Sequence, residues 1–283
     1  MIDETVAEIE EMQTHSSSVV AVKAATALRE LTDREFPTVD EYLRTLQRNS
    51  RALQRANRSH ASLHTTQRDI VDTVTAREPG DVSTAKGYTV EAIERVVDDV
   101  DAEKDGAATR AAARIEDGET LYTHDFSTTV RTAIENVVSD GASLDLYVDE
   151  SRPRYRGRQM ARELAALDGV DVTLAVDAAA GYYLEECDRV LVGMASIVDD
   201  TLYNRIGTYT LATAAAHRDV PMTAVGGSSK VVDGAFAFEN QFRSPAEVLR
   251  EPTDEFTVGN PAYDGTPTSL LESVITDTKV REP

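Results

Sequence analysis

The sequence has no tryptophan, a single cysteine and only five lysines. That one cysteine, Cys187, excludes an internal disulfide and any metal site built from several cysteines, which is typical of a reducing compartment. No apolar run approaches the roughly 20 residues that span a bilayer, and the amino terminus shows no basic and apolar signal. We therefore expect a soluble, cytoplasmic protein with no membrane contact.

Positive charge is also scarce, because 29 Lys and Arg face 50 Asp and Glu and leave a formal charge of −21. Dense carboxylates keep a protein hydrated at high salt, where screening removes most of their repulsion, so the composition predicts a halophilic source. Binding the phosphate backbone of a nucleic acid needs a basic face that releases counterions. Direct nucleic-acid binding is therefore not expected, although a local basic pocket remains allowed.

Several motifs of common catalytic and cofactor sites are missing. No Walker or Gly-x-Gly-x-x-Gly sequence is present, which argues against an ATPase or a dinucleotide enzyme, and we expect no cofactor. His60 and His64 stand at helical spacing without the glutamate of a zinc motif, so a solvated pair is expected and no metal site. Ser127 follows His124 and Asp125 but lacks the Gly-x-Ser-x-Gly elbow, which argues against a hydrolase triad.

The spacing of apolar residues divides the chain into two regions. In the first region apolar residues recur at helical intervals, as at Val6, Ile9 and Met12. Four further helices are expected there, over residues 19–28, 39–57, 62–76 and 90–114. The first region therefore reads as a helical domain, which we place at residues 1–117.

From residue 118 onward, short runs rich in Val, Leu and Tyr alternate with helical patterns. The predicted strands are 120–123, 144–148, 172–176, 189–192 and 222–225, and the predicted helices are 128–139, 156–167 and 208–217. Such alternation predicts a parallel sheet covered on both faces by helices. The expected fold class is α/β, with a helical amino-terminal domain followed by a Rossmann-like parallel sheet domain over residues 118–283. Ligands bind such sheets beyond the carboxyl ends of the strands.

The loops after the first two predicted strands contain groups that suit an anion. Ser127 and the hydroxyls after it begin a helix, whose free amides favour an anion, although a capped helix without a ligand explains them equally well. Four arginines then stand within seven residues, and their guanidinium groups pair well with phosphate or carboxylate oxygens. A solvated helix face paired with Glu163 is the alternative. These arginines are Arg152, Arg154, Arg156 and Arg158.

Two later loops add further candidates. An amide, a guanidinium, a glycine and a hydroxyl meet at a predicted loop-to-helix junction, and these belong to Asn204, Arg205, Gly207 and Thr208. Lys230 ends the sequence Gly-Gly-Ser-Ser-Lys after the last predicted strand. Glycine and serine pairs usually mark an ordinary turn, but the position after a strand and the lysine favour a binding role.

Taken in order, these motifs resemble one superfamily. They are Glu150-Ser151-Arg152-Pro153 with Gly157, then Val192-Gly193, residues 204–208 and residues 221–230. The superfamily contains the alpha, beta and delta regulatory subunits of translation initiation factor 2B, ribose 1,5-bisphosphate isomerase and methylthioribose 1-phosphate isomerase. The resemblance extends from Ser16-Ser17-Ser18 to residues 267–276.

The resemblance implies a helical domain, a Rossmann-like domain, and a pocket for a phosphorylated sugar or nucleotide. It also implies homodimers through the carboxy-terminal domain, sometimes assembled into hexamers. The regulatory subunits bind the alpha subunit of initiation factor 2, so that partner is possible here. The implied ligand-binding residues are Ser17, Ser18, Arg152, Asn204, Arg205, Gly207, Thr208 and Lys230, with Arg205 standing where lysine is usual.

This chain lacks the catalytic pair of the isomerases that it resembles. Those enzymes place a cysteine after Thr-His and an aspartate in Gly-Ala-Asp, where this chain has Asp125 and Ala195. The main hypothesis is therefore a non-catalytic regulatory protein that binds a phosphorylated small molecule or a translation initiation partner. The alternative is a ribose 1,5-bisphosphate isomerase of nucleoside-phosphate salvage, in which Asp125 takes over the acid/base work.

Overall fold

The computed structural model describes residues 2–11, 16–232, 236–251 and 253–282. The chain forms two compact units, Met1–Ala102 and Glu103–Pro283. Within the described ranges, no helix is both long enough and apolar enough to cross a membrane. The predicted domain boundary between residues 117 and 118 stays a prediction.

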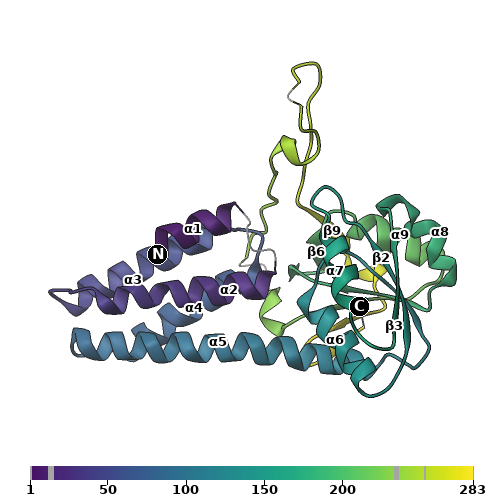
Figure 1. Ribbon diagram of the computed structural model, residues 1–283. Coiled ribbons are helices and arrows are strands. Elements are labelled where there is room, and N and C mark those ends of the chain that lie inside the picture. The colour runs from purple at the N-terminus through teal and green to yellow at the C-terminus, as the bar shows by residue number, and fades with distance from the viewer. Residues whose placement is uncertain (1, 12–15, 233–235, 252, 283) are drawn as a thin grey trace. The chain divides into compact units, whose positions relative to one another are not determined.

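The first unit is helical (Figure 1). Its helices are α1 (Ile2–Glu10), α2 (Ser17–Ala27), the short 3-10 helix η1 (Leu28–Asp33), α3 (Val39–Ala56), α4 (Ala61–Ala76) and α5 (Val82–Ala112), whose last turns belong to the second unit. The predicted helices are confirmed, although Met12 lies outside the described residues. Helix α5 begins earlier than residue 90 because the Asp81 carboxylate accepts the backbone N–H of Thr84 at 2.8 Å and caps its first turn.

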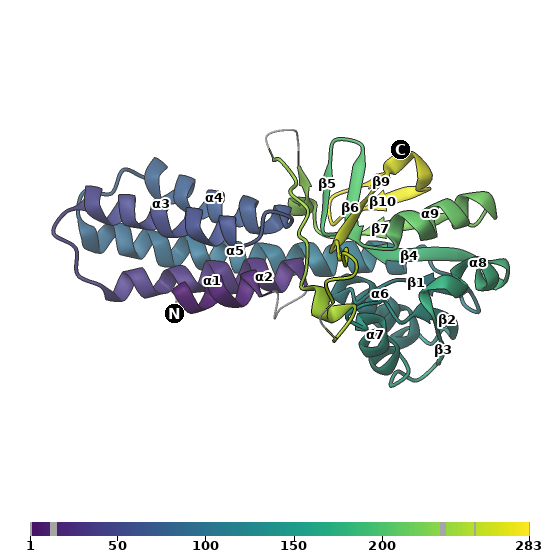
Figure 2. The ribbon, with the colours of Figure 1, turned by 90° about the horizontal axis from the view of Figure 1, so that it is seen from above.

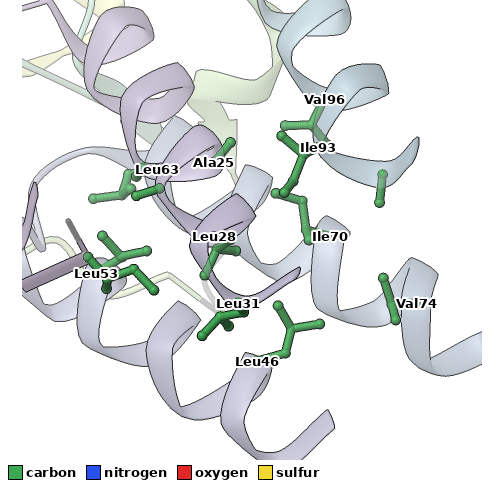
Figure 3. Close-up of a cluster of buried hydrophobic side chains, with 14 of the residues drawn as sticks. Ala25, Leu28, Leu31, Leu46, Leu53, Leu63, Ile70, Val74, Ile93 and Val96 are labelled. Carbon is green, nitrogen blue, oxygen red and sulfur yellow. The ribbon is translucent and has the colours of Figure 1, made fainter. Parts of the chain in front are cut away.

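The core of the first unit is almost entirely aliphatic (Figure 3). Leu28 and Leu46 are fully buried with Leu53, and Ile70 joins them from α4. The expectation that His60 and His64 are solvated was wrong, because His60 is only 1% exposed. Burial also lowers the pKa of His64. His60 directly precedes α4, where the neighbouring polar residues Ser59 and Ser62 are buried as well.

The second unit contains a seven-stranded sheet with strand order β11-β10-β7-β4-β1-β2-β3. Every neighbouring pair is parallel except β10 with β11. The strands are β1 (Thr120–Thr123), β2 (Leu144–Asp149), β3 (Val170–Ala175), β4 (Arg189–Gly193), β7 (Met222–Val225), β10 (Ser273–Ile275) and β11 (Val280–Arg281). The predicted parallel sheet is confirmed.

Helices cover both faces of this sheet. Successive side chains of a strand point to opposite faces, so neighbouring residues pack against different helices. Leu121 belongs to the core beneath α6 (Thr128–Ser139) and α7 (Arg156–Leu164), which also includes the end of α5. Its neighbour Tyr122 belongs to the core on the other face, with α8 (Ala180–Tyr183) and α9 (Thr208–His217). Figure 2 shows α6 and α9 on opposite sides of the strands. The predicted fold class, a helical region followed by a Rossmann-like sheet, is confirmed.

A second, four-stranded sheet was not predicted, and residues 193–204, which contribute to it, were expected to form a loop. Its order is β8-β5-β6-β9, with β6 antiparallel to both of its neighbours. The strands are β5 (Ser196–Val198), β6 (Thr201–Arg205), β8 (Val231–Val232) and β9 (Tyr263–Pro267). These strands are too short to show a clear period in the sequence, so the prediction missed them.

Candidate functional site

The large sheet has a topological switch point between β1 and β4. From this pair, the chain adds β2 and β3 on one side and β7 and β10 on the other. Connections that leave in opposite directions open a crevice at the carboxyl ends of the two central strands. Asp125 follows β1 and Ala195 follows β4, so the two positions that the resemblance relates to catalysis both lie at this crevice.

His124 forms the buried centre of the site. Its Nδ1 lies 2.7 Å from Oδ2 of Asp149, and its Nε2 lies 3.1 Å from the carbonyl oxygen of Ile206. Both partners are acceptors, so both ring nitrogens must donate and the ring is an imidazolium. Burial alone would lower the pKa of His124, but the charge of Asp149 outweighs it and raises the pKa from 6.5 to about 10.

The same network holds two residues in the left-handed backbone conformation. The Ser151 hydroxyl donates to Oδ1 of Asp149 at 2.7 Å and accepts the backbone N–H of Asp125 at 2.9 Å. Asp125 and Ser151 have φ of 61° and 56°, a conformation that costs free energy outside glycine. The chain of hydrogen bonds from His124 through Asp149 to Ser151 stabilises both and sets the direction of the Asp125 side chain.

The raised pKa of His124 predicts a pH dependence of stability. A group whose pKa is higher in the folded state than in the unfolded state stabilises the fold. For His124 this contribution is complete at pH values below the unfolded pKa of 6.5, and it is lost as the pH rises through about 10. Urea unfolding at pH 6.5 and pH 10 should therefore show a larger loss of stability for the wild type than for His124→Gln, which has no proton to lose. Equal losses in the two proteins would contradict the imidazolium assignment.

Asp125 forms an ion pair with Arg205. Its Oδ2 lies 3.2 Å from Nε of Arg205, and both side chains are mostly buried, at 10% and 16% exposed. Arg205 ends β6, and its guanidinium carbon lies 4.7 Å from the centre of the Tyr263 ring. Burial opposes the charge of Arg205, but Tyr263 and Asp125 outweigh it and raise its pKa. The structure therefore places a carboxylate and a guanidinium side by side at the switch point.

The loop from β6 to α9 brings three further predicted residues to the same place. The Asn204 side-chain amide donates to the Thr208 hydroxyl at 3.2 Å, and Thr208 donates to the carbonyl of Arg205 at 2.6 Å. Gly207 has φ of 108°, and a Cβ there would lie 3.0 Å from the His124 ring. Glycine is thus required both by the backbone conformation and by the close approach of His124.

The amides at the start of α9 already have an anionic partner. Asp264 accepts the backbone N–H of Gly207 at 2.7 Å and that of Tyr209 at 3.2 Å. The antiparallel register of β6 and β9 sets Asp264 opposite Asn204, which positions its carboxylate at the helix terminus. Asp264 thus satisfies two of the free amides at this helix terminus, and the ligand-binding role of residues 204–208 stays a prediction.

The four arginines after β2 separate into different environments. Arg152 is exposed, and its guanidinium donates to the Tyr155 hydroxyl at 2.8 Å and to the Val248 carbonyl at 3.3 Å. Arg158 pairs with Glu150, whereas the alternative from the sequence had been a pair with Glu163. Arg154 lies 3.6 Å from Glu247, and the Arg156 guanidinium donates to the Gln159 side chain at 2.6 Å.

Lys230 lies in the loop after β7 and is buried at 6% exposed. Burial lowers its pKa to about 8, although the nearby charge of Glu103 opposes this shift. The amides of this loop are bonded to carboxylates, since Asp277 accepts the N–H of Ser228 at 2.7 Å and Glu103 accepts that of Ser229 at 3.1 Å. Lys230 is the cation of this loop that the sequence proposed for ligand binding, and that role stays a prediction.

Ser17 and Ser18 belong to the first unit. Both are buried at the start of α2, and the Ser17 carbonyl accepts the Ser62 hydroxyl at 3.2 Å. Their ligand-binding role stays a prediction. Ser127 accepts the backbone N–H of Val130 at 3.3 Å and so caps α6, as the simpler of its two interpretations expected. In the described parts of the chain no group of His, Cys, Asp and Glu is arranged to hold a metal ion.

Several residues of the site escaped the sequence analysis. Asp149 and Asp264 lie far along the chain from their partners. The Thr-His sequence before Asp125 was the one available signal for His124, and only the fold shows that this ring is buried against a carboxylate.

Comparisons with known proteins identify the family and support the fold. The family model described as "Initiation factor 2 subunit family" matches residues 13–283. Ribose 1,5-bisphosphate isomerases of Haloterrigena turkmenica and Haloferax volcanii are each 31% identical to this chain; the alignments cover 96% of it and 88% and 86% of those proteins. The fold resembles that of translation initiation factor eIF-2B from Pyrococcus horikoshii, with a TM-score of 0.83 at 23% identity, covering 100% of this chain and 97% of that one.

Proposed function

Because this chain belongs to the initiation factor 2 subunit family, we propose that it is a sugar-phosphate isomerase that acts on ribose 1,5-bisphosphate. The observation that carries the proposal is the place of Asp125, a carboxylate at the switch point, held by its backbone and by Arg205. The two haloarchaeal relatives support the choice of substrate, since they bear that enzyme's name and align over nearly the whole chain.

An aldose-to-ketose conversion of this substrate conserves every atom. The bond between C1 and the ring oxygen breaks and that oxygen takes a proton, one hydrogen moves from C2 to C1, and the C2 hydroxyl loses its proton to become a carbonyl. Asp125 is the group that would accept and return a proton. Arg205 is placed to stabilise negative charge that develops on a sugar oxygen.

The test is conversion of ribose 1,5-bisphosphate to ribulose 1,5-bisphosphate by the purified protein in molar KCl, followed by phosphorus NMR. Asp125→Asn should reduce turnover by at least about a hundredfold, since it removes the proton-transfer group. Asp168→Asn is the matched control, because this exposed carboxylate follows α7 and should leave turnover unchanged. Equal turnover in Asp125→Asn and the wild type would exclude Asp125 from the chemistry.

A second candidate is a non-catalytic regulatory protein that binds a phosphorylated sugar or nucleotide. Ala195 favours it, because this buried residue places no ionisable group after β4. Binding to the alpha subunit of initiation factor 2 and assembly as a homodimer or hexamer are proposals of the same kind. Absence of turnover in the wild type, combined with a thermal shift on adding phosphorylated sugars, would favour this candidate.

A further inference from the structure

Four arginines gather in the second unit although the chain as a whole carries a formal charge of −21. Arg154 and Arg156 come from the loop after β2 and the start of α7, Arg205 comes from β6, and Arg243 comes from the segment 236–251. Three separate parts of the chain thus supply guanidinium groups whose charges act on one another.

The geometry of Arg154 and Arg243 converges on a single atom. Nε of Arg154 lies 3.6 Å from Oε1 of Glu247, and a terminal nitrogen of Arg243 lies 3.2 Å from the same oxygen. Glu247 ends the short 3-10 helix η5 (Pro245–Glu247) and also accepts the side-chain amide of Asn260 at 3.2 Å through its other oxygen. One carboxylate oxygen therefore lies between two guanidinium groups.

Arg156, the first residue of α7, supplies a third guanidinium, whose charge lowers the pKa of Arg154. Its guanidinium carbon lies 4.7 Å from the centre of the Phe126 ring, and its Nε is buried without a hydrogen-bond partner in the described structure. Its pKa is lowered, chiefly by burial and also by the charge of Arg205, although the charge of Asp125 opposes this shift. The pKa of Arg154 is likewise lowered by burial and then by Arg243, so these cations act on one another.

We propose that Arg154, Arg156 and Arg243 form a binding site for a phosphate group, in which the Glu247 carboxylate occupies the position of one phosphate oxygen. Guanidinium forks match phosphate oxygens in geometry as well as in charge. The Arg154 and Arg243 side chains are 29% and 13% exposed, so a ligand can reach the first of them from solvent. The identity of the ligand rests on the proposed function, in which the bound group is one of the two phosphates of ribose 1,5-bisphosphate.

Binding of inorganic phosphate, measured by thermal melting at one fixed KCl concentration, tests the site without any sugar. Arg154→Gln/Arg243→Gln should weaken phosphate binding at least tenfold. Glu247→Gln should strengthen it, because it removes the carboxylate that competes for the same arginines. Arg158→Gln is the matched control, since it removes one positive charge from the adjoining helix α7, at a residue paired with Glu150.

The response of Glu247→Gln separates a ligand site from a structural brace. If these arginines only hold the segment around Glu247, the variant lowers stability and leaves phosphate binding no tighter, which overturns the proposal. If the double variant fails to fold, Glu247→Gln against Arg158→Gln still decides. If the protein turns over ribose 1,5-bisphosphate but these variants do not change phosphate binding, the isomerase proposal stands and the phosphate site is overturned. If the variants change phosphate binding as expected but the protein shows no turnover, the phosphate site stands and the isomerase proposal is overturned.

Discussion

Replacing Asp149 by asparagine should lower the free energy of unfolding by about 3 to 5 kcal/mol, the usual cost of removing one partner from a buried ion pair. Asp149 and His124 have side chains only 4% and 3% exposed. The asparagine would leave the imidazolium without a counter-charge, or the ring would have to give up the proton that it now shares with Asp149. Urea unfolding followed by circular dichroism at pH 7 measures the loss.

Glu150→Gln is the control for this substitution, because it makes the same chemical change at the next residue. Glu150 pairs with Arg158 at 2.5 Å, but the arginine side chain is 42% exposed. Ion pairs open to solvent usually contribute less than about 1 kcal/mol, so a small effect is expected. Losses of similar size in the two variants would show that the buried pair contributes no more than a surface pair.

Replacing Gly157 by alanine should destabilise the second unit by at least about 3 kcal/mol, which is the upper range for overpacking a core. A Cβ at this position would lie 1.7 Å from the backbone oxygen of Asp149 and 2.8 Å from its carbonyl carbon. Backbone cannot move aside as a flexible side chain can, so α7 would have to shift away from β2. The midpoint of urea unfolding reports this shift.

Gly181→Ala provides the comparison for Gly157→Ala. Gly181 lies in α8 of the same unit, and a Cβ there would meet no atom within 4 Å. Alanine is favoured over glycine in a helix by about 1 kcal/mol, so this variant should be neutral or slightly more stable. A neutral Gly157→Ala would mean that the contact between α7 and β2 is looser than its geometry indicates.

Much of the large sheet could be predicted because its strands are buried on both faces. The strands β1 and β7 and the helices α6 and α9 begin and end at the predicted residues. Such strands are rich in apolar side chains, and the change from this pattern to helical spacing marks each boundary. The place of Asp125 after β1 followed directly from that reading of the sheet.

The rest depended on contacts between distant parts of the chain. The hairpin of β5 and β6 is too short for a period to be visible, and β9 contains Gly265 and Pro267, which usually argue against a strand. Arg243 reaches its place through segment 236–251, which has no regular pattern. The sequence could therefore identify an arginine-rich loop but could not tell which of its arginines converge.

The carboxylates that hold loop amides have a consequence for redesigning the charge of this protein. A variant intended for work in dilute buffer would exchange many of the 50 acidic residues for neutral ones to reduce self-repulsion. Asp264, Asp277 and Glu103 should be left out of that exchange, and so should Asp177, which accepts the backbone N–H groups of Ser151 and Arg152 at 2.7 Å. Neutralising these four would weaken the loops around the switch point, whereas the exposed carboxylates are the ones available for substitution.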